Sequence, residues 1–571
     1  MSNEPPTPTA SDTAEPASPS QGAPGAGVKE TIESILIAFI LAFVFRAFVV
    51  EAFVIPTGSM APTLLGAHMR FTCKDCGWRF DVNYNSRSIG EDIEIPNHVP
   101  SVLVKEVESD RFGRRSLVQR IIPKTFTITC PNCGYRIPKE DQADPENDAT
   151  NPPVFYGDRI LVLKYIYLLH EPRRWDVVVF KSPDDPKYQM NYIKRLIGRP
   201  GEQIMVLDGD VYARTADKEP FVVQTKPYAV QQALWRIVYD NDFHPRALQR
   251  EDGSTWKQPW VKEDGENATV AWDVSGRVFR FEGQSNAGAI RFDPAANPTA
   301  NAFTDWIAYD VTQNQPNDHP NTYNPPAPAV WNAHVSDLKL DLFYQRQSGD
   351  GTLRLELSKL TDAFTAEILP DRVKLYRRSA DGLERLLQER SYPFKAHGPA
   401  RLEFSNVDYQ VTLRINGQDW LQSTPEQYHP DVHRLMLAFG ENEKLPPPGV
   451  RIIARNQQCE LSHVGLFRDV YYLNHGNRSD GQPFWGSPDN PIRLGADEFF
   501  VMGDNAIISG DARYWSNPID LPQEDLLVDA GRVPARFMLG RAIFVYWPAG
   551  YRPTPKLPGV IPNFGDMRFI H

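Results

Sequence analysis

The feature that most restricts the fold is one long apolar run at residues 32–53, IESILIAFILAFVFRAFVVEAF. As a helix this run would extend about 33 Å, which matches a bilayer core of about 30 Å. A buried core helix and a cleaved signal peptide are the alternatives, but a signal peptide begins with a basic region and the preceding segment is acidic and long. We therefore predict a membrane-spanning helix at residues 29–53. Lys29 is the only basic residue before the run, so charge does not set an orientation.

Length and charge set outer limits on the protein. The chain has 571 residues, which is too long for one ordinary core and predicts two or more domains. Its formal net charge is -11, which argues against nucleic acid as a partner because phosphate backbones require a basic surface. Residues 1–28 consist mainly of Pro, Ala, Ser, Thr and Gly, and such a segment has too little apolar surface to fold. We expect it to be a disordered tail.

After the apolar run, the chain is dominated by short β-branched and aromatic segments. RILVL at 159–163, DVVVF at 176–180 and AIFVYW at 542–547 are typical of strands. Helical periodicity is scarce apart from short pieces near 228–238 and 522–527. The sequence therefore predicts a mainly β protein after one N-terminal transmembrane helix.

Two residues suggest a catalytic pair. Ser59 lies in IPTGSMAPTL, directly after the apolar run, and Lys194 lies in NYIKRLIGRPG. A serine hydroxyl becomes a good nucleophile only when a base takes its proton, and a lysine can be that base when burial lowers its pKa. Taken singly, a serine in a turn or a lysine in a strand is usually just an exposed residue. The assignment therefore depends on the segments around them.

These segments carry a resemblance to a known family. In chain order they are TGSMAPTL (57–64), GDRILVLK (157–164), RRWDVVVFKSP (173–183), YIKRLIGRPGE (192–202), VMGDNAIISGDARYW (501–515) and GRAIFVYWP (540–548). Their order and their position after an apolar run resemble the ordered boxes of bacterial type I signal peptidases, which are Ser/Lys serine proteases. The matched segments cover a small part of the chain because two long inserts separate them.

The resemblance implies a mechanism and a location. Ser59 would attack the scissile carbonyl, Lys194 would be the general base, and the Ser59 N–H and Thr57 hydroxyl would hold the oxyanion. The substrates would be secretory preproteins with small residues before the cleavage site. The enzyme would be a hydrolase of the cytoplasmic (inner) membrane, single-pass and in contact with membrane lipid, with its catalytic domain on the extracytoplasmic side. It would need no cofactor for catalysis.

Three further residues would support this pair, according to the same resemblance. Ser509 matches a serine that hydrogen-bonds and orients the lysine, and Asp511 and Arg513 match a structural ion pair. Residues 506–508, Ala-Ile-Ile, depart from the more polar residues often found there. We expect no role for them.

The first insert carries two C-x-x-C-G-aromatic motifs, which contain Cys73, Cys76, Cys130 and Cys133. Four thiolates can close a tetrahedral structural zinc site, and the repeated motif is typical of a zinc ribbon. Disulfides are the alternative, because the location implied by the resemblance would permit them. We favour one structural zinc, since C-x-x-C pairs are tight for bridges within a pair. Cys459 has no evident partner, and we expect it to be a buried apolar residue.

The second insert shows alternation of apolar and polar residues over many short segments. The apolar positions are Leu338, Leu340, Leu342 and Tyr344, then Leu353, Leu355 and Leu357, then Val373 and Leu375, then Leu402 and Phe404, then Val411, Leu413 and Ile415. A period of two, closed by an Asn416-Gly417 turn, predicts an antiparallel β-sandwich or jelly roll. Residues 409–418 are similar to a strand and turn of concanavalin-like or laminin-G-like domains. Such a domain could bind a glycan or peptide or be a bare spacer, and its partner is unknown.

The predicted order of domains follows from these segments. We expect a tail at 1–28, a transmembrane helix at 29–53, catalytic β segments at 54–70, 151–215 and 471–571, a zinc-ribbon insert at 71–150, a connecting segment at 216–270 and a β-sandwich insert at 271–470. Because the serine and lysine must lie within about 3 Å of each other, we expect both inserts to loop away from the site.

Two other functions are compatible with parts of the sequence. An inactive envelope protein could use the ribbon and sandwich to bind a partner, although both predicted catalytic residues are present. A self-cleaving Ser/Lys regulator would share the pair, but such repressors carry a DNA-binding helix-turn-helix where this chain has an apolar run and an acidic tail.

Overall fold

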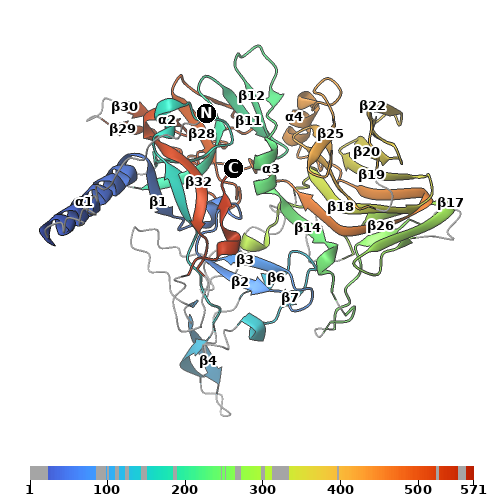
Figure 1. The fold of residues 1–571 in the computed structure, drawn as a ribbon, viewed down its shortest axis with the longest axis horizontal. Coiled ribbons are helices and arrows are strands. Elements are labelled where there is room, and N and C mark those ends of the chain that lie inside the picture. Colours follow the sequence, from blue (N-terminus) through green and yellow to red (C-terminus); the bar gives the residue numbers. More distant parts are fainter. Residues whose placement is uncertain are drawn as a thin grey trace, which may run out of the picture. The chain divides into compact units, whose positions relative to one another are not determined.

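The computed structural model describes residues 24–84, 98–99, 102–109, 115–122, 126, 128–142, 151–183, 190–245, 247–250, 253–263, 272–296, 303–310, 333–394, 398–521, 526–550 and 561–571. The chain forms two compact units, Met1–Glu51 and Ala52–His571. The predicted tail lies largely outside the described residues, since the description begins at residue 24. Strands dominate the second unit (Figure 1), as the sequence predicted.

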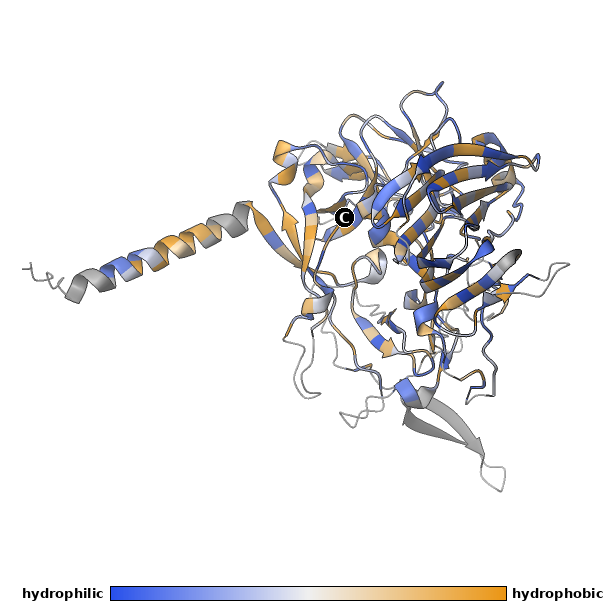
Figure 2. Cartoon of the chain, turned by 45° about the vertical axis from the view of Figure 1, so that its right-hand side comes forward, coloured by the Kyte–Doolittle hydropathy of each residue, from blue (hydrophilic) through white to orange (hydrophobic). Residues whose placement is uncertain are grey.

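The apolar run forms helix α1 (Pro24–Phe48). Its described apolar side chains are exposed, for example Leu36 and Phe39 at 58% and 62%, and Figure 2 shows them as one hydrophobic stretch. No helix among the described residues has both the length and the hydropathy required to cross a membrane. The helix has the predicted length of 25 residues, but it begins at Pro24, within the predicted tail, and ends at Phe48. It ends earlier than predicted because Val50–Val54 is strand β1. Val50 and Val54 are β-branched, which favours a strand over a helix.

An eight-stranded sheet carries the predicted catalytic lysine, with the order β1-β8-β32-β9-β10-β28-β31 and β33 paired with β32. Its strands are β1 (Val50–Val54), β8 (Arg159–Leu163), β9 (Val177–Lys181), β10 (Asn191–Gly198), β28 (Glu498–Met502), β31 (Val533–Pro534), β32 (Met538–Trp547) and β33 (Arg568–Phe569). A four-stranded sheet follows the order β13-β12-β11-β27. It contains β11 (Gln203–Leu207), β12 (Asp210–Arg214), β13 (Val222–Val223) and β27 (Ile492–Arg493). Both sheets therefore join segments from the two sides of the second insert.

The first insert is built from hairpins. Strands β2 (His68–Thr72) and β3 (Arg79–Asn83) form one hairpin, and β6 (Ile128–Thr129) and β7 (Arg136–Ile137) form another. Each C-x-x-C motif lies in the turn of one of these hairpins. Strands β4 (Val102–Ser109) and β5 (Arg115–Ile122) pair with each other between them. The extra hairpin explains why the two cysteine motifs are so far apart in the sequence.

The second insert forms a 13-stranded antiparallel sheet whose main order is β22-β21-β20-β19-β26-β18-β23-β24-β25. Its strands are β14 (Arg236–Asp240), β15 (Trp260–Lys262), β16 (Trp272–Asp273), β17 (Phe279–Phe292), β18 (Leu338–Ser348), β19 (Thr352–Lys359), β20 (Asp362–Ile368), β21 (Arg372–Arg378), β22 (Glu384–Ser391), β23 (Ala400–Val407), β24 (Gln410–Ile415), β25 (Gln418–Gln422) and β26 (Val450–Arg468). Strand β26 pairs with β14, β17, β18 and β19 and so links the whole sheet. Strands β14 and β15 come from the connecting segment, so this sheet begins earlier than predicted.

The predicted burial of the apolar positions in this sheet is confirmed. Every apolar position singled out in the sequence is at most 1% exposed, from Leu338 to Ile415. The halves of the sheet face each other, since β19 contacts β23 and β22 contacts β25. Asn416 and Gly417 adopt positive φ angles of 51° and 81° between β24 and β25, as the predicted tight turn requires.

The remaining elements are short. They are α2 (Ile166–Leu169), α3 (Tyr228–Leu234), α4 (Val432–Gly440), β29 (Ile519–Leu521), β30 (Leu526–Val528) and the 3₁₀ turns η1 (Gly58–Met60), η2 (Lys139–Gln142), η4 (Asn241–Phe243), η9 (Ala535–Phe537) and η10 (Phe564–Asp566). The helix predicted near 228–238 ends at Leu234. The piece predicted near 522–527 is wrong where it can be compared, because Leu526 and Leu527 begin a strand paired with β29.

Candidate active site

Ser59 lies in the 3₁₀ turn η1, which begins directly after the extended residue Thr57. The side chain of Ser59 is only 7% exposed. Thr57 is exposed and makes no side-chain hydrogen bond that caps the turn. The first amides of a helical turn have no partner within it. The Ser59 N–H therefore belongs to the group of amides that can bind an anion.

Lys194 lies on the central strand β10, where it is opposite Val178 of β9. Its Nζ atom is 2.9 Å from Ser59 Oγ and 3.1 Å from the Ile193 carbonyl oxygen. The lysine is 5% exposed, and burial is the main reason why its pKa falls from 10.5 to about 8. The structure thus places a buried ammonium group with a lowered pKa in contact with a serine hydroxyl.

The loop after strand β28 covers the other side of Ser59. The Asn505 N–H donates a 3.1 Å hydrogen bond to the Ser59 carbonyl oxygen. Gly503 leaves no room for a side chain, because a Cβ atom there would be 2.4 Å from that same carbonyl oxygen and 2.3 Å from Ser509 Oγ. A glycine is therefore required for the loop to approach the serine this closely.

Two of the predicted supporting residues form a buried ion pair. Arg513 donates from Nε and Nη2 to the Asp511 carboxylate at 2.8 Å in both cases, and both side chains are fully buried. Asp511 Oδ2 also accepts a 2.9 Å hydrogen bond from the Gly503 N–H. Ser509 Oγ is buried but has no hydrogen-bond partner among the described residues, so the predicted bond to Lys194 is not formed here. The Asp511–Arg513 ion pair therefore stabilises the loop that covers Ser59, through the hydrogen bond from the Gly503 N–H.

A second buried ion pair lies directly beside the lysine and was missed in the sequence. Arg195 donates to both carboxylate oxygens of Asp504, at 2.6 and 2.7 Å, and both side chains are fully buried. Arg195 also donates to the carbonyl oxygens of Trp175 and His571. Both residues lie in segments that resemble the family, Arg195 in YIKRLIGRPGE and Asp504 in VMGDNAIISGDARYW, but only the pairing of β10 with β28 brings them together.

The prediction that both inserts loop away from the site is wrong for the second insert. The Tyr309 ring packs against Gly58, where an added Cβ atom would be 2.4 Å from Tyr309 Cε1. The Tyr309 hydroxyl also accepts a 3.3 Å hydrogen bond from the Gly66 N–H. Asp310 Oδ1 accepts a 2.7 Å hydrogen bond from Asn505 Nδ2. Residues of the second insert therefore support the turn that holds Ser59.

The connecting segment contributes a third contact to this region. Arg236 Nη2 donates to the carbonyl oxygens of Ala61 at 3.3 Å and Asp504 at 3.4 Å. Arg236 is 6% exposed, and burial lowers the pKa of its guanidinium. No sequence signal marked this residue, since it lies outside the six segments that carry the resemblance, between 192–202 and 501–515.

The four paired cysteines meet in one cluster in the first insert. Cys73 Sγ is 3.7 Å from Cys133 Sγ, and Cys76 Sγ is 3.7 Å from Cys130 Sγ. The four sulfur atoms all lie within 4.8 Å of one another, and all four thiols are free. A tetrahedral zinc with Zn–S bonds of about 2.3 Å separates its sulfur ligands by about 3.75 Å, whereas a disulfide requires about 2.05 Å. The four residues can hold a metal ion.

The fifth cysteine lies elsewhere. Cys459 on β26 is 2% exposed and free, as expected for a buried apolar residue. Burial raises the pKa of its thiol to about 12.

Comparison with known proteins supports the assignment of these segments. The pattern of the family described as "Signal peptidase, peptidase S26" matches residues 28–84 and 145–254, which include Ser59 and Lys194. These two segments are similar to signal peptidases of the S26 family. The match excludes most of the first insert and all of the second, and it stops before Ser509, Asp511 and Arg513.

Curated relatives agree with the S26 assignment. Signal peptidase I of Pseudomonas aeruginosa is 40% identical over 112 residues, which are 19% of this chain and 36% of the relative. Signal peptidase I of Aquifex aeolicus is 30% identical over 115 residues, which are 20% of this chain and 40% of the relative. The similarity therefore spans well under half of each relative's length.

Solved structures are similar to part of this chain at low sequence identity. A carbohydrate binding module, CBM66 from Bacillus subtilis, is 11% identical and covers 37% of this chain and 95% of that chain, with a TM-score of 0.22. This similarity is too low to carry an argument about fold or ligand.

Proposed function

We propose that this chain is a membrane-associated serine endopeptidase that removes signal peptides from secretory preproteins. The observation that carries the proposal is the 2.9 Å contact between Lys194 Nζ and Ser59 Oγ. The lowered pKa of the buried lysine, about 8, supports it because the base must be neutral to accept a proton. The match to the signal peptidase family includes both residues and supports signal-peptide-bearing preproteins as the substrate class.

The mechanism follows from these two side chains. Neutral Lys194 takes the proton of Ser59 as its Oγ attacks the scissile carbonyl, and the protonated lysine then returns this proton to the leaving amine. The Ser59 N–H and the Thr57 hydroxyl hold the oxyanion of the tetrahedral intermediate. Lys194 then activates the water that hydrolyses the acyl-enzyme. Small residues before the cleavage site are selected because larger side chains are excluded.

The supporting residues act on the position of the lysine and the loop. We assign Asp511 and Arg513 to bracing the loop at Gly503, which follows from their hydrogen bonds. We assign Ser509 to orienting Lys194 after a rotation of its hydroxyl, since its Oγ is buried beside Gly503.

Preprotein cleavage by the purified full-length chain in detergent tests the proposal. We expect cleavage after a small-x-small sequence, with loss of activity in Ser59→Ala and in Lys194→Ala. Lys262→Ala is the matched control, because Lys262 is an exposed lysine on β15. Equal cleavage by Ser59→Ala, or no cleavage by the unmodified chain, would contradict the proposal and favour an inactive binding protein.

We also propose that Cys73, Cys76, Cys130 and Cys133 hold one structural zinc ion. Their sulfur spacing of 3.7 Å fits the edge of a tetrahedral Zn–S₄ site. A site closed by four thiolates has no open position for water, so the ion would stabilise the two hairpins and take no part in catalysis. Metal analysis of the purified chain before and after reduction distinguishes zinc from disulfides.

We further propose that helix α1 attaches the chain to the cytoplasmic membrane, with the catalytic residues on the extracytoplasmic side. The exposed apolar side chains of α1 support this proposal, since apolar surface of this extent is stable only against lipid or protein. Flotation of the full chain with lipid vesicles tests it. We expect Leu36→Lys combined with Ile40→Lys to release the chain, while Lys262→Ala floats normally.

A further inference from the structure

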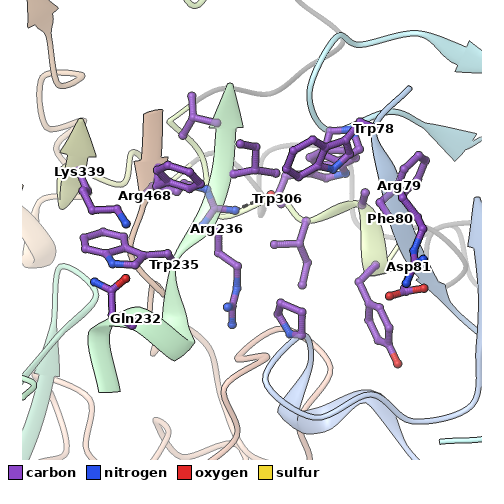
Figure 3. A pocket seen from close by; sticks show the side chains of 18 residues that line it. Trp78, Arg79, Phe80, Asp81, Gln232, Trp235, Arg236, Trp306, Lys339 and Arg468 are labelled. Atoms are coloured by element: carbon purple, nitrogen blue, oxygen red, sulfur yellow. Dashed lines mark hydrogen bonds between the residues drawn. The ribbon is translucent and has the colours of Figure 1, made fainter. Parts of the chain in front are cut away.

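A cavity of about 460 Å³ lies where the catalytic segment, the first insert, the connecting segment and the second insert meet. Pro62 of the catalytic segment lines it, together with Trp78 of the first insert, Trp235 of the connecting segment and Trp306 of the second insert. The volume is in the range of small-molecule sites, about 300–1,000 Å³. Figure 3 shows Gln232, Trp235 and Lys339 at one end, Trp78, Arg79 and Asp81 at the other, and Arg236 and Arg468 between them.

Three buried cations line this cavity without a close carboxylate partner among the described residues. Arg236 and Arg468 are 6% and 3% exposed and donate only to backbone carbonyl oxygens. Lys339 is 6% exposed, its ion pair with Asp341 Oδ2 is long at 3.9 Å, and Glu403 is a second carboxylate that acts on its charge. A buried cation that lacks a partner is costly. The cavity therefore has an excess of positive charge that a bound anion would neutralise.

The hydrogen-bond donors and acceptors of the lining also favour an anionic ligand. Trp235 Nε1 is buried and has no acceptor among the described residues. Asp81 is the only carboxylate in the lining, and its oxygens already accept from Arg70. The buried cations and Trp235 of the lining thus offer N–H donors, so a ligand that satisfies these donors must supply acceptor oxygens.

The walls of the cavity are aromatic. Trp78, Phe80, Trp235, Trp306 and Phe467 all contribute to the lining. Lys339 Nζ lies 5.0 Å from the centre of the Trp235 ring and 4.6 Å from that of Phe467. The ammonium group therefore makes cation–π contacts with both rings. A ligand that fills this space buries apolar surface on the rings while its charged group reaches the cations.

We propose that this cavity binds an amphipathic anion, a carboxylate attached to an apolar or aromatic body. The carboxylate would bind at Lys339 and Arg468 or Arg236, and the body would pack on the tryptophan rings. Such a carboxylate could belong to a free organic acid or to the C-terminus of an apolar peptide. The inference is independent of the peptidase proposal, because it concerns binding alone.

Titration of the full-length chain by tryptophan fluorescence and calorimetry tests this proposal. One pair of probes is 3-phenylpropionate and its neutral amide, and the other is N-acetyl-leucyl-phenylalanine and its C-terminal amide. We expect at least one acid to bind about tenfold or more tightly than its amide, since a hydrogen bond to a charged group contributes about 1.5–3 kcal/mol. Binding of only the first acid identifies a small-molecule site, and binding of only the second identifies a peptide C-terminus.

Variants connect the binding to the cavity. Lys339→Met should remove most of the preference for the acid over its amide. Trp235→Phe should lower the affinity for the acid but keep this preference. Lys374→Met is the control, because Lys374 lies on β21 and does not line the cavity. Equal affinity for acid and amide, no binding of either pair at millimolar concentration, or a preference unchanged in a folded Lys339→Met variant would overturn the proposal.

Discussion

Asp310 Oδ1 accepts a 2.7 Å hydrogen bond from Asn505 Nδ2, which ties the second insert to the loop that covers Ser59. The Asn505 backbone N–H in turn donates to the Ser59 carbonyl oxygen at 3.1 Å. Burial raises the pKa of Asp310 to about 7, so the carboxyl is largely protonated in mildly acidic solution. The second insert therefore supports the position of Ser59, although it lies outside the S26 match.

The first prediction concerns this bond. Asp310→Ala removes the acceptor and should lower kcat/KM about tenfold, the effect of losing one buried hydrogen bond of about 1.4 kcal/mol. Asp310→Asn keeps an oxygen acceptor and should retain most of the activity. Steady-state cleavage of a preprotein measures both variants. If the two variants lost activity to the same extent, the hydrogen bond would not be the cause.

The second prediction concerns the pH dependence of cleavage. Lys194 must be neutral to act as a base, and its pKa is about 8. We expect kcat/KM to rise about tenfold per pH unit below this pKa and to level off above it. A pH profile of preprotein cleavage provides the test. A profile that is flat from pH 6 to about 9 would exclude Lys194 as the titrating base.

The third prediction separates the stability of the fold from its activity. The pKa of Lys194 is 10.5 in the unfolded chain and about 8 in the folded one. Below pH 8 the buried lysine is charged, which lowers the free energy of unfolding. Lys194→Met should abolish cleavage yet raise the free energy of unfolding at pH 7, by up to about 3 kcal/mol. The gain should shrink as the pH rises from 8 towards 10.5, where the native lysine is neutral in the fold. Urea unfolding at several pH values measures this, and destabilisation at pH 7 would contradict it.

The fourth prediction tests the close approach of the loop to Ser59. Gly503→Ala would place a Cβ atom 2.4 Å from the Ser59 carbonyl oxygen, so the loop or the serine must move. We expect cleavage to fall about 100-fold, the effect of a displacement of about 1 Å in a catalytic group. Gly510→Ala is the control, because no atom lies within 4 Å of its added Cβ atom. Equal activity in both variants would show that the loop can adapt.

The fifth prediction concerns the cysteine cluster. Cys130→Ser should reduce the bound zinc from one ion to none and lower the unfolding temperature, because the metal-binding energy is part of the folding energy of the hairpins. Cys459→Ala should keep the zinc, since Cys459 lies on β26 away from the cluster. Atomic absorption and thermal unfolding measure these effects. Retention of stoichiometric zinc by Cys130→Ser would show that the ion binds elsewhere.

Much of the fold followed from local patterns in the sequence. Alternating apolar residues from Leu338 to Ile415 predicted buried strands, and the Asn416-Gly417 turn lies where it was expected. Such patterns are local because the side chains of a strand point alternately to opposite faces. The apolar run did not predict where the helix ends. The helix stops at Phe48, and the residues from Val50 form strand β1, which pairs with β8.

The contacts between distant segments could not be read in this way. Arg195 and Asp504 form a buried ion pair because β10 lies beside β28, and no spacing in the sequence encodes that neighbourhood. Similarly, the second insert was expected to lie away from the site, but Tyr309 packs against Gly58 of the serine turn and Asp310 bonds to Asn505 of the loop that covers Ser59. Residues that are far apart in the sequence are therefore in contact in the fold, and the sequence did not indicate these contacts.

The sequence by itself determined the identities of the chemical groups: Ser59, Lys194, the four paired cysteines and the alternating strands, because each is recorded in residue type and local spacing. Only the tertiary structure decided how they act together. It placed Lys194 Nζ 2.9 Å from Ser59 Oγ in a buried site, and it grouped Lys339, Arg236 and Arg468 around one aromatic cavity. Burial and proximity set the pKa of the base and the charge of the cavity, and both depend on residues that are far apart in the chain.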